Sequence, residues 1–292
     1  MKEIVVISGK GGTGKTSITA SLAHLLKGNA VIADYDVDAA DFHIIASPQI
    51  RERGPFSSSK KASVIPENCR ACGKCLEACR FGAIEVSDGL YRIDSMKCEG
   101  CGVCKIVCPF DAVNFGNSQN GEWFVSDTRF GTFVHAGLFP GEENSGKLVT
   151  HVKLKAREIA QEQRKKVLLA DGSPGVGCPV ISSLASADAV LAVTEPTLSG
   201  IHDLDRVLEL TRGFGIDTFI CINKSDINNE LTEKIREKAG KSEIEVLADI
   251  PYDRVFIDSQ IIKKSVVEYD SNCLISKRIK DMSKRLKEIL EI

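Results

Sequence analysis

A glycine-rich segment near the N-terminus has the residue types that hold phosphate. Residues 9–16 are GKGGTGKT and match G-x-x-x-x-G-K-[ST]. Glycines let backbone N–H groups turn inward around phosphate oxygens, while the final lysine and threonine suit the β/γ-phosphates and Mg²⁺. We therefore expect a nucleoside triphosphate site here. Its predicted residues are Gly9, Lys10, Gly11, Gly12, Thr13, Gly14, Lys15, Thr16 and Ser17.

Eight of the 11 cysteines form two runs with the spacing C-x2-C-x2-C-x3-C. This is the pattern of bacterial two-cluster ferredoxins, in which the fourth cysteine of each run ligates the other cluster. Zinc is the alternative metal, although zinc motifs separate pairs of cysteines. We expect two 4Fe–4S clusters. One would be held by Cys69, Cys72, Cys75 and Cys108, and the other by Cys98, Cys101, Cys104 and Cys79.

The elements that would position these residues alternate between strand and helix. Residues 1–34 suggest strand, glycine loop, helix and strand, and the same alternation resumes in the second half of the chain. A polar segment at residues 48–61 suggests a linker into the cysteine-rich region. The sequence thus predicts an α/β domain with a mostly parallel sheet over residues 1–60 and 116–292. We expect an inserted α+β two-cluster module at residues 61–115.

A second lysine inside the glycine loop carries a family resemblance. KGGTGKT resembles the deviant Walker A sequence of MinD/ParA/Mrp P-loop ATPases, a SIMIBI-type fold, and the whole chain resembles members with an inserted bacterial-type ferredoxin module. In that family the extra lysine, here Lys10, contacts phosphates across a nucleotide-dependent homodimer. The resemblance therefore implies catalytic roles for Lys10 and Lys15, which would stabilise negative charge on the phosphates.

The same resemblance covers the acidic residues. Asp34 and Asp36 in ADYD match the family's D-x-D at switch I, and DGSPG matches its switch II pattern. It implies that Asp36 positions the attacking water and that Asp34 supports the Mg²⁺ shell. Thr16 and Asp171 would hold Mg²⁺, and Gly175 would offer a backbone N–H to the γ-phosphate.

The segment Asn223-Lys224-Ser225-Asp226 leaves the base undecided. It matches N-K-x-D, by which GTPases bind guanine, whereas the resembling ATPases place an asparagine here for adenine. The lysine-bearing phosphate loop favours ATP, and GTP is the alternative.

Composition limits the partners. The 38 basic and 40 acidic residues leave a net charge of −2, so no nucleic acid partner is expected.

The first predicted strand begins almost at Met1, which favours the cytoplasm over secretion. An apolar stripe in residues 274–292 suggests a packed terminal helix, so we do not expect membrane contact. The polar residues Glu142–Lys147 suggest a partner contact or a simple loop.

These observations predict a Mg²⁺-dependent ATPase whose nucleotide state is coupled to two 4Fe–4S clusters. Its purpose would be gated electron transfer or metal-cofactor assembly with an unidentified redox or metallocofactor partner protein. The alternative is a MinD/ParA-like positioning or regulatory ATPase that uses the clusters as a redox sensor.

Overall fold

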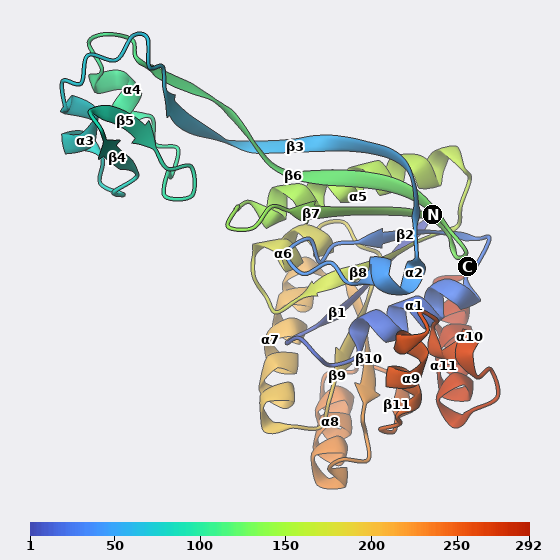
Figure 1. Ribbon diagram of the computed structural model, residues 1–292. Helices are drawn as coiled ribbons and strands as arrows, with labels where there is room; N and C mark the ends of the chain where they lie inside the picture. The colour runs from blue at the N-terminus through green and yellow to red at the C-terminus, as the bar shows by residue number, and fades with distance from the viewer. The chain divides into compact units, whose positions relative to one another are not determined.

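The computed structural model describes residues 1–292, which divide into two compact units (Figure 1). Unit 1 comprises Met1–Gly54, Trp123–Gly137 and Ser145–Ile292, and unit 2 comprises Pro55–Glu122 and Leu138–Asn144. The inserted module was expected at residues 61–115. The observed unit is larger because two long strands continue into it.

One nine-stranded sheet, in the order β11-β10-β9-β1-β8-β2-β7-β6-β3, organises the chain. The pairs from β11 through β7 are parallel. The strands of this parallel part are β1 (Lys2–Ser8), β2 (Ala30–Asp34), β7 (Gly131–Leu138), β8 (Val167–Pro174), β9 (Ala189–Thr194), β10 (Asp217–Asn223) and β11 (Val246–Ile250). Their near-continuous apolar runs are typical of parallel strands that are buried on both faces. The predicted α/β fold with a mostly parallel sheet is confirmed.

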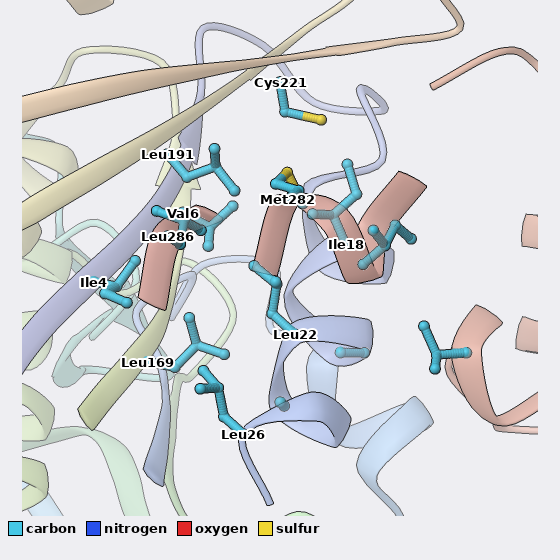
Figure 2. Close-up of a cluster of buried hydrophobic side chains, with 14 of the residues drawn as sticks. Ile4, Val6, Ile18, Leu22, Leu26, Leu169, Leu191, Cys221, Met282 and Leu286 are labelled. Atoms are coloured by element: carbon cyan, nitrogen blue, oxygen red, sulfur yellow. The ribbon is translucent and has the colours of Figure 1, made fainter. Parts of the chain in front are cut away.

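Helices cover the sheet of unit 1 (Figure 1). Helices α1, α10 and α11 pack against one another, while α5 packs on α6. Figure 2 shows Ile18 and Leu22 of α1 with Met282 of α11 beside Val6 and Leu191 of the sheet. The helices of this unit are α1 (Lys15–Leu25), α2 (Phe42–Ala46), α5 (Ser145–Glu162), α6 (Cys178–Leu184), α7 (Leu198–Phe214), α8 (Asn229–Lys241), α9 (Val255–Ile261), α10 (Val266–Tyr269) and α11 (Leu274–Leu290).

The predicted linker at 48–61 is instead part of a strand. β3 (Gln49–Val64) lies at the end of the sheet beside β6 (Val113–Thr128). Its proline, glycine and lysine residues resemble those by which natural edge strands avoid pairing with other chains. The interpretation was wrong because the partner strand lies far along the sequence, beyond both cysteine runs.

Unit 2 contains a structural repeat. Each half has a short helix, α3 (Lys74–Ala78) or α4 (Val103–Val107). Each helix is preceded by a glycine in the left-handed region, Gly73 at φ 79° and Gly102 at φ 74°. The short strands β4 (Ile84–Ser87) and β5 (Leu90–Ile93) pair in a small antiparallel sheet. The two glycines have the same offset in the sequence as the two cysteine runs, so the repeat of the sequence is also a repeat of the backbone.

The apolar stripe of the last helix is used for packing. Ile275, Ile279, Met282 and Leu286 of α11 are all buried in the core of unit 1, as the sequence predicted. None of the helices in residues 1–292 combines the length and apolar character that crossing a bilayer requires.

Candidate functional site

The glycine loop joins β1 to α1 at the carboxyl end of the central strand. Gly14 has φ 93°, and a Cβ atom there would lie 2.3 Å from Nδ2 of Asn223. That Nδ2 donates a 2.7 Å hydrogen bond to the carbonyl of Thr13. The loop therefore needs glycine at 14 both for its backbone angle and for close approach of Asn223. Asn223 thus contacts the phosphate loop directly.

Lys15, Thr16 and Asp171 form the centre of the site. Lys15 Nζ lies 3.0 Å from Asp171 Oδ2 and 3.8 Å from Asp36 Oδ2. The hydroxyl of Thr16 donates to the same Asp171 oxygen at 2.7 Å. Thr19, one turn further along α1, donates to the other Asp171 oxygen at 2.8 Å. A buried carboxylate within β8 is thus fixed against the first turn of α1.

Three further carboxyl groups come from the last residue of β2 and the segment that follows it. Burial and the charge of Asp171 raise the pKa of Asp34 well above its ordinary value. Burial raises the pKa of Asp36 to about 6, even though Lys15 lowers it. Burial, followed by the charge of Asp171, also raises the pKa of Asp41. The site therefore gathers more negative charge than its lysine balances, which is the environment that a divalent cation stabilises.

Several buried polar atoms at this site lack a hydrogen-bond partner among the described residues. They are Thr13 Oγ1, Asp34 Oδ2 and Lys15 Nζ. Lys15 Nζ is ion-paired with Asp171 but makes no well-aligned hydrogen bond to it. Burial lowers the pKa of Lys15, but Asp171, Asp34 and Asp36 raise it by more, so the lysine stays charged. A buried cation and a buried hydroxyl without hydrogen bonds are costly unless a ligand completes them. These atoms fit a phosphate group and a hydrated metal ion.

The side chain of Lys10 contacts residues of its own chain. Its Nζ lies 2.7 Å from Oε1 of Glu195, and it donates to Ser199 Oγ at 2.9 Å and to Thr197 Oγ1 at 3.3 Å. The second oxygen of Glu195 accepts from Lys224 at 2.8 Å. Burial raises the pKa of Glu195, but the hydrogen bonds from the two lysines lower it more, so the carboxylate is held ionised.

A cleft extends from the glycine loop to the segment that follows β11. Asn223 and Lys224 line it, whereas Asp226 does not. Asp226 Oδ1 instead accepts the backbone N–H of Tyr252 at 2.6 Å. The wall opposite the glycine loop is formed by Tyr252, Asp253, Phe256, Ile257 and Gln260.

Two predicted contributions differ from what the structure contains. The N–H of Gly175 donates to the carbonyl of Ser8 at 2.8 Å, so it is not available to a phosphate in this conformation. Gly9 does not line the cleft, and a Cβ atom there would lie 2.3 Å from the Cβ of Asp203. Gly9 therefore lets the loop pack on α7, and the nucleotide contacts of Gly9 and Gly175 stay predictions.

Sequence reasoning missed three polar residues of this site. No role was predicted for Glu195, Thr19 or Asp41, although Asp41 accepts a 3.1 Å hydrogen bond from Thr16. Glu195 directly follows a buried strand, which is the signal that could have identified it. Side chains at the carboxyl ends of neighbouring parallel strands meet at one edge of the sheet.

The eight clustered cysteines of unit 2 line two cavities. One small cavity, of about 20 Å³, is bordered by four cysteines and by Arg70, Tyr91 and Phe110. The other, also of about 20 Å³, is bordered by four cysteines and by Phe81, Ile93 and Glu99. As the side chains stand, no three His, Cys, Asp or Glu residues in 1–292 are arranged to hold a metal ion. The first set is Cys69, Cys72, Cys75 and Cys108, and the second is Cys79, Cys98, Cys101 and Cys104.

The polar segment that begins at Glu142 makes internal contacts. Glu142 accepts from Lys61 and from Asn120, at 2.5 Å each. Burial raises the pKa of Glu142, but these hydrogen bonds lower it more. Asn120 is fully buried and also accepts the N–H of Ser58 at 2.9 Å. Within unit 2, Glu142 therefore ties a loop to the two long strands.

Fold and site define a class of protein. A parallel α/β sheet with a glycine loop between β1 and α1, and acidic residues at adjacent strand ends, is the architecture of P-loop nucleotide-binding proteins. Residues 4–266 match the model of the CobQ/CobB/MinD/ParA nucleotide binding domain. The chain belongs to this family.

The chain is also similar to relatives and to solved structures. An uncharacterised protein of Methanocaldococcus jannaschii is 34% identical over 290 residues, covering 99% of this chain and 97% of the relative. An uncharacterised ATP-binding protein of the same organism is 25% identical over 298 residues, covering 99% and 98%. The cell division ATPase MinD of Pyrococcus furiosus has a similar fold, with a TM-score of 0.60, 16% identity and 99% coverage of both chains. MinD of Pyrococcus horikoshii, solved with Mg-ADP, has a TM-score of 0.57 at 15% identity, covering 99% of this chain and 96% of that one.

Proposed function

We propose that the chain is a Mg²⁺-dependent ATPase that dimerises around its nucleotide. The observation that carries this proposal is the convergence of Lys15, Thr16, Asp36 and Asp171 at the glycine loop, with a buried lysine that is ion-paired with Asp171. Family membership and the MinD structure with Mg-ADP support the same nucleotide class.

In this proposal the chain's residues divide the chemistry among them. Thr16 and Asp171 would hold Mg²⁺ with support from Asp34, and the metal would supply positive charge that offsets the phosphates. Lys15 binds the β/γ-phosphates from inside the loop. Asp36 accepts a hydrogen bond from the water that attacks the γ-phosphorus in line as the bond to the β-phosphate oxygen breaks.

The base contacts favour ATP over GTP. The aspartate of an N-K-x-D motif must present both carboxylate oxygens to guanine. Asp226 lies outside the cleft lining, and one of its oxygens already accepts the N–H of Tyr252. Asn223 and Lys224 are the motif residues that border the cleft. We therefore propose that Asn223 and Lys224 lie beside adenine and do not recognise guanine.

Phosphate release from ATP and from GTP, with and without Mg²⁺, tests this proposal. We expect Mg²⁺-dependent hydrolysis that prefers ATP, and loss of most activity in Lys15→Ala and Asp171→Asn. Asp205→Asn is a suitable control because Asp205 is exposed and pairs with Lys238 on the surface. A clear preference for GTP would refute the base assignment, and full activity in Lys15→Ala would refute the site.

We also propose that unit 2 holds two 4Fe–4S clusters. The supporting observation is that the cysteines border two cavities in the crossed sets that the spacing predicted, with the last cysteine of each run in the other set. Four thiolates around an apolar cavity suit a cluster, which accepts and donates single electrons. The N–H of Ala112 lies 3.3 Å from Sγ of Cys108, an interaction that raises cluster potentials.

The combination of both sites suggests gated electron transfer or metal-cofactor assembly. Anaerobic reconstitution followed by iron analysis and an EPR redox titration, with and without MgATP, tests it. We expect about eight irons per chain from two 4Fe–4S clusters, fewer in Cys108→Ser, and no loss in the control Cys178→Ser. A potential shift of about 59 mV on MgATP binding would correspond to about 1.4 kcal/mol of coupling. Iron content that stays equal in Cys108→Ser and the control would refute the cluster assignment.

A further inference from the structure

We propose that Glu195 is a latch that holds Lys10 on its own chain and must release it before two copies can share nucleotide. This inference rests on the dimer in the proposed function. It concerns an acidic side chain to which neither the family match nor the phosphate-loop motif gives a role.

The contacts of Lys10 define the closed latch. Its ammonium group has three acceptors within 3.3 Å, all from the segment between β9 and the start of α7. Its side chain is 30% exposed and that of Glu195 is 12% exposed, so the pair is partly shielded from water. An ion pair in such surroundings is stronger than one on the open surface. A Lys10 held in this way cannot also contact a phosphate in another subunit.

The latch can open without leaving an unpaired charge inside unit 1. When Lys10 leaves, Glu195 keeps its 2.8 Å hydrogen bond from Lys224. The hydroxyls of Thr197 and Ser199 lie 3.2 Å apart and can pair with each other, while Thr197 continues to cap α7 by accepting the N–H of Gly200 at 2.9 Å. Removing one partner of a buried pair is costly when the other is left unpaired. Here every group keeps a partner, so both positions of Lys10 are accessible.

The competing ligand is the triphosphate bound to a second copy. A nucleoside triphosphate carries several negative charges, against the single charge of Glu195, so a partner that is loaded with nucleotide can extract Lys10. An empty partner offers no such charge. The latch therefore opposes association of nucleotide-free chains and sets the threshold at which the loaded chains pair.

Dimerisation measured by sedimentation velocity tests the latch, using full-length protein with Mg²⁺ and the non-hydrolysable analogue adenylyl imidodiphosphate. Glu195→Gln preserves shape and removes the negative charge. We expect it to lower the dimer dissociation constant about tenfold, which corresponds to about 1.4 kcal/mol. In the Lys10→Ala background the same substitution should have no effect, because the latch acts through Lys10. Glu245→Gln, which affects a surface pair with Arg285, is the matched control and should leave dimerisation unchanged.

A second variant and a second readout keep the proposal testable if Glu195→Gln folds poorly. Ser199→Ala removes one acceptor of Lys10 and leaves Glu195 with Lys224, so it should tighten the dimer about twofold to threefold. In the nucleotide-free protein, amine acylation mapped by mass spectrometry should modify Lys10 several-fold faster in either variant than in the original chain.

The outcomes separate the latch from the proposed function. If all variants dimerise as the original chain does, or if Glu195→Gln has the same effect without Lys10, the latch is refuted and the dimer stands. If no variant dimerises with the analogue, the nucleotide-dependent dimer is refuted, and the latch is refuted with it. Unchanged acylation of Lys10 refutes the closed contact itself.

Discussion

The glycine loop offers a graded test of how this site is built. Gly11, Gly12 and Gly14 lie in one loop but differ in two respects. Gly11 has no positive φ and open space at its Cβ position, Gly12 has φ 79° with open space, and Gly14 has φ 93° with Asn223 at 2.3 Å. Substituting alanine at each position separates backbone strain from steric overlap.

The expected losses of unfolding free energy follow from these differences. Gly11→Ala should change it by less than about 0.5 kcal/mol, as at an unconstrained surface site. Gly12→Ala should cost about 1–2 kcal/mol, the penalty for a side chain in the left-handed region. Gly14→Ala should cost about 2–5 kcal/mol, because the overlap also displaces Asn223 from the Thr13 carbonyl and leaves buried polar groups unpaired.

Urea unfolding of the nucleotide-free protein measures the series, with the fluorescence of Trp123, which lies in unit 1, as the signal. The slope with denaturant should stay constant while the midpoint falls from Gly11→Ala to Gly14→Ala. A double variant, Gly14→Ala with Asn223→Ala, should lose less than the sum of the two single changes because they break the same contact. Equal losses at Gly12 and Gly14, or full additivity with Asn223, would refute the close-packing explanation.

Three further predictions concern buried polar groups. Asp36 keeps its proton up to about pH 6 in the folded protein but releases it near its ordinary value of 3.8 when unfolded. The unfolding free energy of the nucleotide-free protein should therefore fall as pH rises from about 4 to about 6. Urea titrations should show that Asp36→Asn flattens this dependence on pH. An unchanged dependence would contradict the raised pKa of Asp36. Glu3→Gln should cost about 3–5 kcal/mol of unfolding free energy, because Glu3 is fully buried between Lys153 and an arginine. The surface control Glu245→Gln should cost about 0–1 kcal/mol. Similar losses in the two variants would contradict the buried network. Iodoacetamide should label exposed Cys178 in the native protein and spare buried Cys221, whose pKa burial raises; rapid native labelling of Cys221 would count against its placement.

Local patterns were enough for the phosphate loop and for the parallel domain. The loop motif needs only neighbouring residues, since a strand, a tight turn and a helix N-terminus are all encoded within residues 2–25. Apolar runs of the right length likewise identified β2, β8 and β10. The pattern of two-cluster ferredoxins predicts crossed sets of cysteines, and the two cavities are bordered by those sets, while their role as cluster ligands stays a prediction.

Contacts between distant segments account for the features that the sequence did not reveal. β3 lacks an apolar pattern because its stability comes from pairing with β6, so its composition resembled that of a linker. Gly175 and Asp226 match their motifs, yet backbone groups far along the chain, Ser8 and Tyr252, occupy their hydrogen-bonding atoms. A motif specifies residue types, and the fold decides which of their atoms remain available.

By itself, the sequence determined the class of fold, the phosphate loop and the acidic residues beside it, because short-range spacing sets local geometry. Only the tertiary structure decided where Lys10 points and that Glu195 holds it. Lys10 and Glu195 lie in distant parts of the chain and meet because β1 and β9 are neighbours in the sheet. Long-range strand order is fixed by packing of the whole core, and no local pattern records it.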